Sequence, residues 1–246
     1  MALRVNPLRR FIGRSARFVG RRLGDPDALT LQMDAMLRHF AIDLVLDVGA
    51  NTGQYATSLR KAGYTGRIVS FEPLSAAHAR LTSRARHDPL WTVHPRCAVG
   101  SSAGQVEINV AQNSVSSSVL PMLPAHYEAA PESRFVATER VELIKLDSVF
   151  GQYASAASRT WLKIDTQGFE QQVLDGALAS ARSITAVQLE LSLVPLYDGQ
   201  SLWEYFLTRM QGKGYQLWAF IPGFSDARTG RSLQLDVVFV RAPQPG

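Results

Sequence analysis

A ten-residue segment, residues 44–53, constrains the fold of this chain more than any other. It reads LVLDVGANTG, a short apolar run that ends in Asp47 and passes into a turn of small residues. Such a pattern is typical of a buried strand that turns directly into a helix. Gly49 and Gly53 let the backbone approach a ligand where a Cβ atom would collide, and Thr52 can cap the helix that follows. The segment therefore predicts a strand–turn–helix unit whose crevice holds a nucleoside.

The rest of the chain alternates apolar runs with helical segments, which predicts a parallel sheet with helices on both faces. The predicted strands are 43–48, 67–72, 91–99, 160–165, 184–191, 215–221 and 235–241, and the main helices are 52–62, 73–86, 168–181 and 202–213. Between them, residues 106–110 and 140–146 are predicted to be extended, and Asp147 to cap a short helix. The polar turn between the last two strands predicts an antiparallel hairpin at the sheet edge. Residues 111–135 show no clear period, and we interpret them as a long functional loop or lid.

The positive charge is concentrated at the N-terminus. Residues 1–24 contain seven arginines and no acid, so the remaining residues sum to −2 when the whole chain carries +5. Residues 7–23 form an amphipathic pattern with arginines on one face, and 29–40 predict a second helix. We therefore predict a helical extension over 1–40 and a folded domain over 41–246. Two interpretations of 7–23 stay open: peripheral contact with anionic lipid, or a solvated basic face.

Composition excludes several classes of protein. The single cysteine, Cys97, rules out an intramolecular disulfide and a multi-cysteine zinc site. The sequence has neither an apolar run of membrane-spanning length nor the apolar core of a secretory signal. We expect a cytoplasmic protein, with the inner face of the membrane as a possible peripheral location. A nucleic-acid enzyme is not favoured, because its basic residues would gather around the cleft.

The spacing of the glycines indicates which nucleoside the crevice holds. A dinucleotide site needs G-x-G-x-x-G, and that spacing is absent. Asp47 precedes the first glycine, where a carboxylate would repel a pyrophosphate but suits the ammonium of an amino-acid moiety. Glu72 ends the second strand, where it can accept hydrogen bonds from both ribose hydroxyls. Together these acids point to S-adenosylmethionine. The alternative is a tight turn with a fortuitous acid.

Several segments resemble the FkbM-type methyltransferases. They are Asp47–Gly53 (DVGANTG), Phe71–Pro73 (FEP), Ala98–Gly100 (AVG) and Leu162–Ala177 (LKIDTQGFEQQVLDGA). The last is the most specific, and the similarity runs from about residue 43 to 241. In one departure, Gln167 stands where the family usually has glutamate, so a catalytic role of that acid would be altered here.

The resemblance implies a Rossmann-like class I methyltransferase fold with seven mostly parallel strands. It also implies O-methylation, often of sugars or natural products. Carried onto this sequence, the residues that bind the cofactor would be Asp47, Gly49, Ala50, Asn51, Gly53, Glu72 and Pro73. Ala98 and Val99 would lie near the adenine.

Methyl transfer to a hydroxyl needs alignment and a general base. Asp165 and Glu190 end two predicted strands that border the crevice, so each is a candidate for base, metal ligand or hydroxyl anchor. A purely structural role is the alternative for each. His126, in the predicted lid, is a third candidate for the base. Ser114, Ser116, Ser117 and Ser118 are either ligand contacts or ordinary loop residues.

Asp165, Glu190 and Asp236 are oxygen ligands of the kind that Mg²⁺ takes, but we favour a metal-free site because no ligand spacing is visible. The sequence thus predicts an S-adenosylmethionine-dependent O-methyltransferase acting on a small molecule or glycan, with a sugar of a glycolipid as the favoured acceptor. The alternatives are a nicotinamide-dependent oxidoreductase on a similar sheet and a non-catalytic nucleoside-binding protein. The oligomeric state is not predicted.

Overall fold

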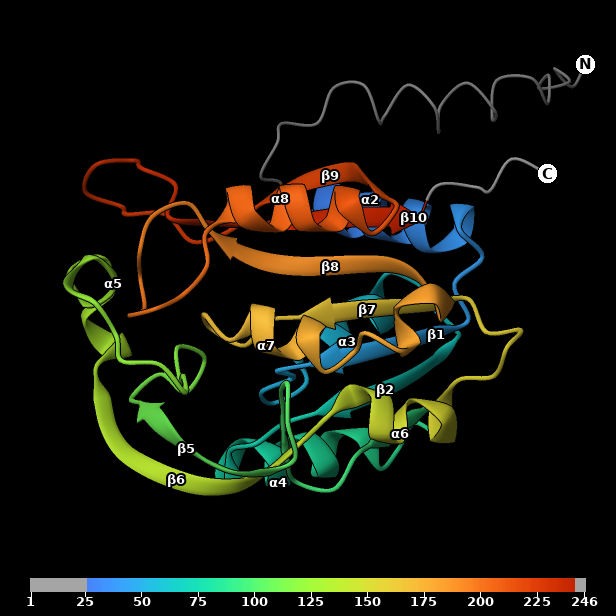
Figure 1. The fold of residues 1–246 in the computed structure, drawn as a ribbon, viewed down its shortest axis with the longest axis horizontal. Helices are drawn as coiled ribbons and strands as arrows, with labels where there is room; N and C mark the ends of the chain where they lie inside the picture. The colour runs from blue at the N-terminus through green and yellow to red at the C-terminus, as the bar shows by residue number, and fades with distance from the viewer. Residues whose placement is uncertain (1–25, 242–246) are drawn as a thin grey trace, which may run out of the picture.

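The computed structural model describes residues 26–241, and its centre is a seven-stranded sheet (Figure 1). The strand order is β3-β2-β1-β7-β8-β10-β9. The bounds are β1 Leu44–Val48, β2 Arg67–Phe71, β3 Trp91–Val93, β7 Thr160–Ile164, β8 Ile184–Ser192, β9 Tyr215–Pro222 and β10 Gln234–Arg241. The first five strands in this order are parallel, and β10 pairs antiparallel with both β8 and β9. The predicted α/β fold with an antiparallel edge hairpin is confirmed.

Helices cover both faces of the sheet, because the central strands are apolar on both sides. One face packs against α2 Pro26–His39, α3 Gln54–Lys61 and α4 Ser75–Ala85, and the other against α6 Leu146–Tyr153, α7 Glu170–Asp175 and α8 Trp203–Gly212. In β1, Leu44, Leu46 and Val48 belong to the core with α6–α8, while Val45 belongs to the core with α2–α4. All five residues of β1 are buried.

Helix α2 belongs to the core on the α2–α4 face of the sheet, because its residues Met33, Met36 and Leu37 are buried there. It corresponds to the helix predicted over 29–40. The amphipathic segment 7–23 lies outside the described residues. Of the helices described between residues 26 and 241, none is long and apolar enough to cross a membrane.

The predicted strand 91–99 is wrong, because the chain divides there between two sheets. The His94 amide still donates to the Ser70 carbonyl at 2.9 Å, but Pro95 has no N–H to continue the ladder. The chain then enters β4 Ala98–Val99 in a second sheet of order β4-β6-β5, with β5 Gly104–Ala111 and β6 Phe135–Ile144. Residues 106–110 and 140–146 thus lie largely within an antiparallel pair.

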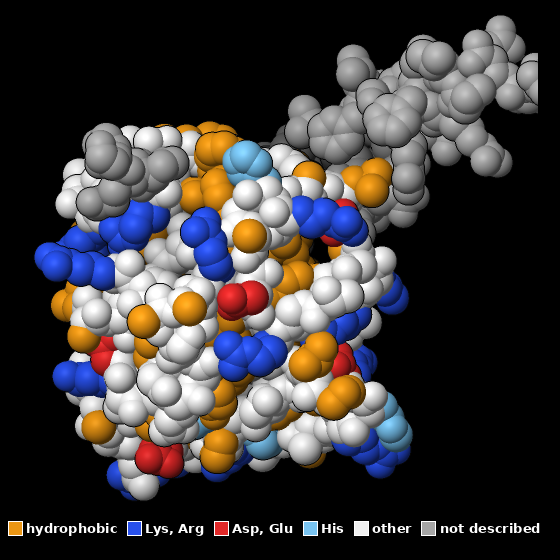
Figure 2. Space-filling view, turned by 90° about the vertical axis from the view of Figure 1, so that its right-hand side faces the viewer, with side chains coloured by type: hydrophobic (Ala, Val, Ile, Leu, Met, Phe, Trp, Pro, Cys, Tyr) orange, Lys and Arg blue, Asp and Glu red, His pale blue; other side chains and the backbone are white. Residues whose placement is uncertain are grey.

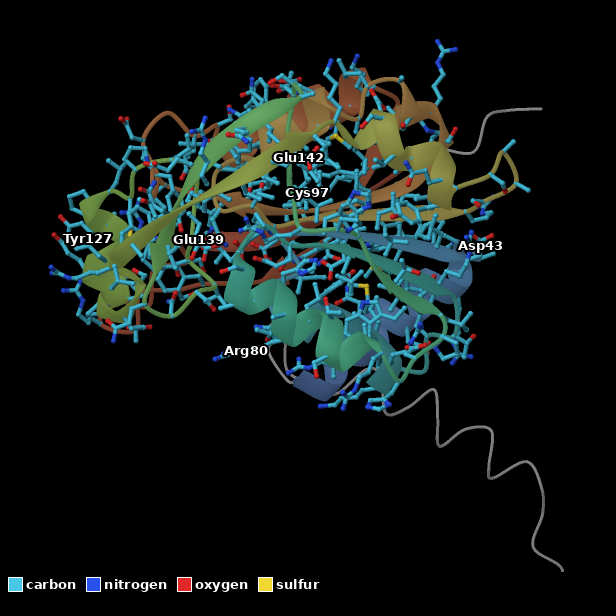
Figure 3. The ribbon with its side chains drawn as sticks, turned by 90° about the horizontal axis from the view of Figure 1, so that it is seen from below. Asp43, Arg80, Cys97, Tyr127, Glu139 and Glu142 are labelled. Atoms are coloured by element: carbon cyan, nitrogen blue, oxygen red, sulfur yellow. The ribbon has the colours of Figure 1, made fainter. Side chains whose placement is uncertain are left out.

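The long strand β6 crosses beneath the main sheet, from the region of Tyr127 toward Glu142 near Cys97 (Figure 3). Its Glu139 accepts hydrogen bonds from the Ser75 amide at 2.9 Å and from Arg96 at 3.0 Å. These contacts fix the small sheet to the start of α4. Residues 111–135, predicted to lack regular structure, contain α5 Pro124–Ala129 and a short 3₁₀ turn at Pro131–Ser133.

Three local predictions fail for identifiable reasons. The predicted helix 168–181 is reduced to α7, and a Cβ atom on the next residue, Gly176, would lie 1.9 Å from the Gly100 carbonyl oxygen. Asp147 does not cap α6, because its carboxylate accepts hydrogen bonds from the amides of Ala179 and Ser180. Thr52 does not cap α3, which instead begins after Gly53 with no side-chain cap.

Candidate functional site

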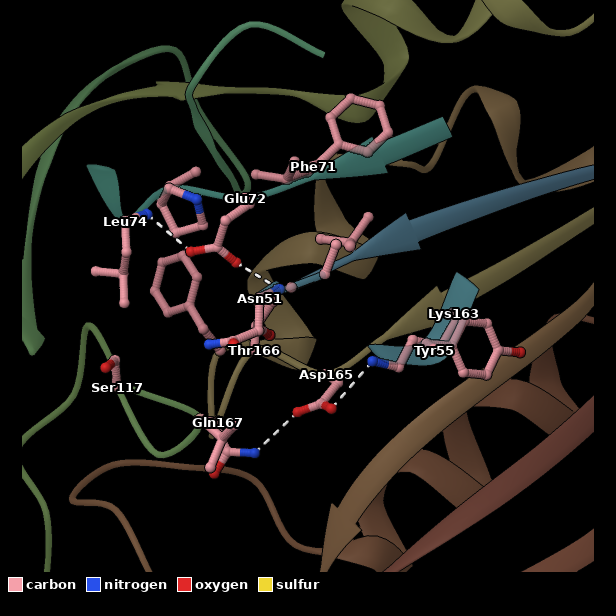
Figure 4. Close-up of a pocket in the computed structure, with 18 of the residues that line it drawn as sticks. Asn51, Tyr55, Phe71, Glu72, Leu74, Ser117, Lys163, Asp165, Thr166 and Gln167 are labelled. Atoms are coloured by element: carbon pink, nitrogen blue, oxygen red, sulfur yellow. Dashed lines mark hydrogen bonds and ion pairs between the residues drawn. The ribbon is translucent and has the colours of Figure 1, made fainter. Parts of the chain in front are cut away.

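A cavity of about 490 Å³ opens at the carboxyl-terminal tips of β1, β2 and β7 (Figure 4). This is the edge at which open α/β sheets bind ligands. Its walls come from the β1–α3 turn, the end of β2, the segment around β4, residues 114–119 and the segment after β7. Of the predicted cofactor residues, those that line it are Gly49, Ala50, Asn51, Glu72, Pro73, Ala98 and Val99.

The turn after β1 is shaped by glycine at its point of closest approach. Gly49 has φ +81°, and a Cβ atom there would lie 1.9 Å from the carbonyl oxygen of Asp165. Glycine therefore allows the ends of β1 and β7 to come together at the base of the cavity. Asn51, also in the left-handed region at φ +46°, donates from its side chain to the Ser114 hydroxyl at 3.2 Å. The turn is thus tied to the opposite wall.

The carboxylate of Glu72 is fixed by backbone amides. One oxygen accepts from the Asn51 amide at 2.7 Å and the other from the Leu74 amide at 2.8 Å (Figure 4). Each oxygen keeps a second lone pair for a ligand hydroxyl. Burial raises the pKa of Glu72 to about 7, despite the two amide bonds that favour the charged form.

Next to Glu72 the cavity wall is apolar. Leu74, Cys97, Ala98, Ile108 and Phe169 line it on this side. Ala98 and Ile108 belong to one buried cluster with Leu74, and Phe169 packs against it. An apolar slot beside a carboxylate suits a flat aromatic base next to a ribose.

Two predicted cofactor residues do not line the cavity. Gly53 is buried against other elements, where a Cβ atom would lie 2.7 Å from the ring of Trp91. Its role is therefore the packing of α3 against the sheet. Asp47 is fully buried, points to the α2–α4 face of β1 and lies 3.5 Å from the Ser70 hydroxyl. It lies beneath the cavity rather than in its wall.

Asp47 is part of a polar row that crosses four strands. Ser70, Asp47, Lys163 and Gln188 are neighbours in register across β2, β1, β7 and β8. The Nζ atom of Lys163 lies 3.6 Å from Asp47 and 3.0 Å from Asp165, and the ammonium also lies over the ring of Tyr55. Burial alone would lower the pKa of Lys163, but the carboxylates of Asp165 and Asp47 raise it above its ordinary value.

Asp165 lines the cavity and carries an ionised carboxylate. Burial would raise its pKa, but the Lys163 ammonium and the hydrogen bond from Gln167 hold the pKa below its ordinary value. The Gln167 amide nitrogen lies 2.8 Å from Oδ1 of Asp165 and also donates to Glu190. Glu190 does not line the cavity, and burial together with the Asp165 charge holds its pKa well above the ordinary value.

The opposite end of the cavity contains polar residues that the sequence motifs did not indicate as a group. The Tyr55 hydroxyl donates to the Gln188 carbonyl oxygen at 2.7 Å, and the Gln188 amide donates to Asp236 at 2.9 Å. Burial raises the pKa of Asp236 to about 6. Strand alternation is the signal that could have found them, because it places Gln188 and Asp236 on the face that carries Lys163.

The structure does not bring His126 to the cavity. Its side chain is buried between the rings of Tyr197 and Phe224, and its Nδ1 atom has no hydrogen-bond partner. Burial lowers its pKa to about 4. Of the four serines, Ser114, Ser117 and Ser118 line the cavity, while Ser116 is buried.

The described part of the chain contains no cluster of side chains that could bind a metal ion. Between residues 26 and 241, no group of three or more His, Cys, Asp or Glu side chains has a geometry that could hold a metal ion. Asp165 and Glu190 are instead joined through an amide, and Asp236 accepts from another amide.

Figure 2 shows the end of the molecule opposite the carboxyl-terminal tips of β7 and β8. Lys and Arg side chains are scattered there among apolar and uncharged ones, rather than gathered in one patch. The cavity of about 490 Å³ lies away from this face, at the carboxyl edge of the sheet.

The sheet order and the cavity at its carboxyl edge define a class I methyltransferase fold. A solved structure of a putative O-methyltransferase from Klebsiella pneumoniae is similar, with a TM-score of 0.51 and 11% identity, covering 98% of this chain and 92% of that one. A model of the methyltransferase FkbM domain matches residues 47–217, so the chain belongs to the FkbM methyltransferase family.

Two further similarities are weaker. Magnesium protoporphyrin IX methyltransferase from Synechocystis PCC 6803 aligns with a TM-score of 0.48 and 11% identity, covering 98% of this chain and 87% of that one. A polyribonucleotide nucleotidyltransferase of Magnetococcus marinus is 24% identical over 136 residues. That match covers 54% of this chain and 19% of the relative, so the chain spans about a fifth of the relative's length.

Proposed function

We propose that this chain is an S-adenosylmethionine-dependent O-methyltransferase acting on a hydroxyl of a small molecule or glycan. One observation carries the proposal: a single cavity joins the Glu72 carboxyl group, with the apolar wall beside it, to the carboxyl group of Asp165, whose pKa Lys163 lowers. The first feature suits the cofactor and the second suits a general base.

The residues present fit the cofactor. The volume of about 490 Å³ lies within the usual range for small-molecule sites. Glu72 is placed for ribose hydroxyls, and the apolar wall beside it for the adenine. Asp165 and the buried Asp47 share a single ammonium, Lys163, so with both carboxyl groups ionised the base of the cavity carries a net charge of −1, which suits a sulfonium cation.

When bound, S-adenosylmethionine supplies a methyl group on a positively charged sulfur, which leaves as a neutral thioether. The protein's share is to orient the acceptor hydroxyl, exclude water and take up its proton. Three carboxyl groups line the cavity, those of Glu72, Asp165 and Asp236, and of these Asp165 is the one whose pKa is lowered, so we assign it the role of base. Lys163 keeps it ionised before the reaction, at 3.0 Å from Oδ2.

The acceptor end supports a hydroxyl-rich substrate. Gln188 uses one lone pair of its carbonyl oxygen for Tyr55 and one N–H for Asp236, so its second N–H and the other oxygen of Asp236 keep hydrogen-bonding capacity at this end. Both can bind hydroxyl groups. A sugar, alone or as the head group of a glycolipid, presents such groups side by side.

Calorimetric titration tests the cofactor, and a labelled-methyl screen tests the acceptor. The protein is expected to bind S-adenosylmethionine and not NAD. With methyl-labelled S-adenosylmethionine, it should label a component of a polar lipid or oligosaccharide extract, and Asp165→Asn should abolish labelling while still binding S-adenosylhomocysteine, which lacks the sulfonium charge. Binding of NAD alone would support the oxidoreductase alternative. Binding without transfer to any acceptor would support a non-catalytic role.

For residues 7–23 we propose peripheral contact with anionic lipid on the cytoplasmic side, which would place the enzyme beside a glycolipid acceptor. The sequence alone supports this part, through the six arginines and the apolar face of residues 7–23. Sedimentation with vesicles of anionic phospholipid tests it. Deletion of residues 1–24 should abolish sedimentation, and an unchanged result would reject the contact.

A further inference from the structure

The segment directly after β7 is held in an unfavourable backbone conformation. Gln167 has φ +54°, a region that costs a non-glycine residue about 1 kcal/mol or more. The Glu170 carboxylate fixes the turn by accepting from the amides of Thr166 at 2.9 Å and Gly168 at 3.1 Å. The Ser118 hydroxyl donates to the Gln167 carbonyl oxygen at 2.6 Å. These contacts hold the backbone of Gln167 in its strained conformation, and this conformation sets the direction of the Gln167 side chain.

That side chain links three groups through a single amide. Its oxygen accepts from the Tyr197 hydroxyl at 2.8 Å, and its nitrogen donates to Asp165 and to Glu190. The single proton of the Tyr197 hydroxyl is also within reach of the Ser116 carbonyl oxygen at 3.0 Å, so the ionised carboxylate of Asp165, which needs a donor, is what turns the amide nitrogen toward the carboxyl groups. Both N–H bonds are used, one for each carboxyl group.

We propose that Gln167 is a positioning residue. Its side-chain amide holds the carboxyl groups of Asp165 and Glu190 side by side as a pair that keeps one proton, which leaves Asp165 ionised toward the cavity.

The surroundings explain which carboxyl group keeps the proton. Asp165 has a cation 3.0 Å away in Lys163 and faces the cavity, whereas Glu190 has only amide donors, Gln167 and Gln234. Lys163 and Asp236 also act on the pair, the first favouring ionisation and the second opposing it. A proton on Glu190 and a charge on Asp165 is therefore the arrangement of lower energy.

The inference rests on the proposed function for its meaning, since it makes Asp165 the group that accepts the proton of the acceptor hydroxyl. An amide suits this place for a chemical reason. A glutamate at 167 could still accept from Tyr197, but its other oxygen would face two carboxyl groups without a donor.

Carboxyl-carbon NMR on protein labelled at aspartate tests the pair directly, with the Asp165 signal identified by its loss in Asp165→Asn. Gln167→Leu keeps the bulk and removes the donor, so Asp165 should bind its proton roughly tenfold more tightly than in the unchanged protein. Gln234→Leu is the matched control, because it removes a donor from Glu190 alone and should leave the Asp165 titration in place. Identical titrations of Asp165 in the unchanged protein and in Gln167→Leu would overturn the proposal.

A second variant keeps the test decisive if Gln167→Leu does not fold. In Gln167→Glu, the loss of stability relative to the unchanged protein should be small at pH 5 and should grow toward pH 8, as the third carboxyl group is forced to ionise. Gln171→Glu makes the same chemical change four residues further along, where Ser201 donates to the side-chain oxygen. Its effect should not depend on pH, and equal pH dependence in the two variants would count against Gln167.

The preference for one of two ligands tests whether the Asp165–Glu190 pair acts on cofactor binding. The ratio of affinities for S-adenosylmethionine and S-adenosylhomocysteine reports the charge near the sulfur, because only the first is a cation. As the pH is lowered, this ratio should fall at a higher pH in Gln167→Leu than in the unchanged protein. If neither compound binds the unchanged protein, the proposed function fails, while the Asp165 titration still decides the role of Gln167.

Discussion

The Nζ atom of Lys163 lies 3.0 Å from Asp165 and 3.6 Å from Asp47, so one buried cation serves two carboxylates on neighbouring strands. The second distance is too long for a hydrogen bond, and Oδ1 of Asp47 has no hydrogen-bond partner. Burial accordingly raises the pKa of Asp47 despite the nearby ammonium. Lys163 therefore pairs more strongly with Asp165, which faces the cavity, than with Asp47.

Removing this cation should be costly. Lys163→Met would leave the buried carboxyl group of Asp47 and the partly exposed one of Asp165 without a counter-charge, and we expect a loss of about 3 kcal/mol of unfolding free energy at pH 7, measured by urea denaturation. The loss should shrink toward pH 5, where the carboxyl groups can take up protons. Adding Asp47→Asn to Lys163→Met should recover part of it. A loss below about 1 kcal/mol would show that the ion pair does not hold the sheet together.

Glu72 should make cofactor binding depend on pH near neutrality. Its pKa of about 7 lies above the ordinary glutamate value, so the group loses its charge as the pH falls through that range. Because ribose hydroxyls donate more strongly to the ionised form, affinity for S-adenosylmethionine should weaken from pH 8 to pH 6. Glu72→Gln should bind roughly tenfold or more weakly at pH 8 and lose this dependence, as seen by calorimetry. Equal affinity of the unchanged protein at both pH values would contradict the assignment.

The raised pKa of Glu72 affects stability in the opposite direction from binding, because its contribution to stability improves as the pH falls. Since the folded-state pKa of Glu72 is raised, its burial costs most above pH 7 and nothing below the ordinary value. Stability of the ligand-free protein should therefore rise as the pH falls from about 7 toward 4.5, and Glu72→Gln should remove this contribution. Denaturation series at several pH values separate the two effects, because only the binding experiment contains cofactor.

Gly49 should tolerate no side chain. A Cβ atom there would lie 1.9 Å from backbone at Asp165, and the residue has φ +81°, so Gly49→Ala should cost at least about 3 kcal/mol and abolish cofactor binding. Gly151 in α6 is the control, since a Cβ atom there would meet nothing within 4 Å. Gly151→Ala should leave stability unchanged or raise it by up to about 1 kcal/mol. Thermal unfolding with and without ligand measures both.

The sequence predicted the framework because its signals are local. The apolar runs, the glycine turn and the final hairpin follow from period and turn chemistry, and the carboxyl-edge position of Asp165 follows from the sheet. Asp47, predicted to bind the cofactor, is not among the residues that line the cavity. Its position two residues before Gly49 does not reveal that its side chain points to the face covered by α3.

The contacts that complete the site join residues far apart in the chain. Tyr55 meets Gln188 across 133 positions, and Gln167 meets Tyr197 across 30, so no local pattern could connect them. His126 was predicted as a candidate base from its place in the predicted lid. In the structure it belongs to α5, and its buried side chain lies between Tyr197 and Phe224, away from the cavity.

His126 should therefore govern acid stability rather than catalysis. Its folded-state pKa of about 4 lies below the ordinary 6.5, so in acid the unfolded chain binds a proton that the folded one refuses. The contribution of His126 to stability should be constant above about pH 6.5 and fall toward pH 4, by about 2 kcal/mol after allowance for partial solvation. His126→Phe, which can fill the space between the two rings, should remove this decline, whereas His87→Gln, at an exposed position, should keep it. Urea denaturation at pH 7 and pH 4.5 compares them. A decline that persists in His126→Phe would assign acid sensitivity to other groups, and loss of methyl transfer in this variant with normal stability would restore His126 as a candidate base.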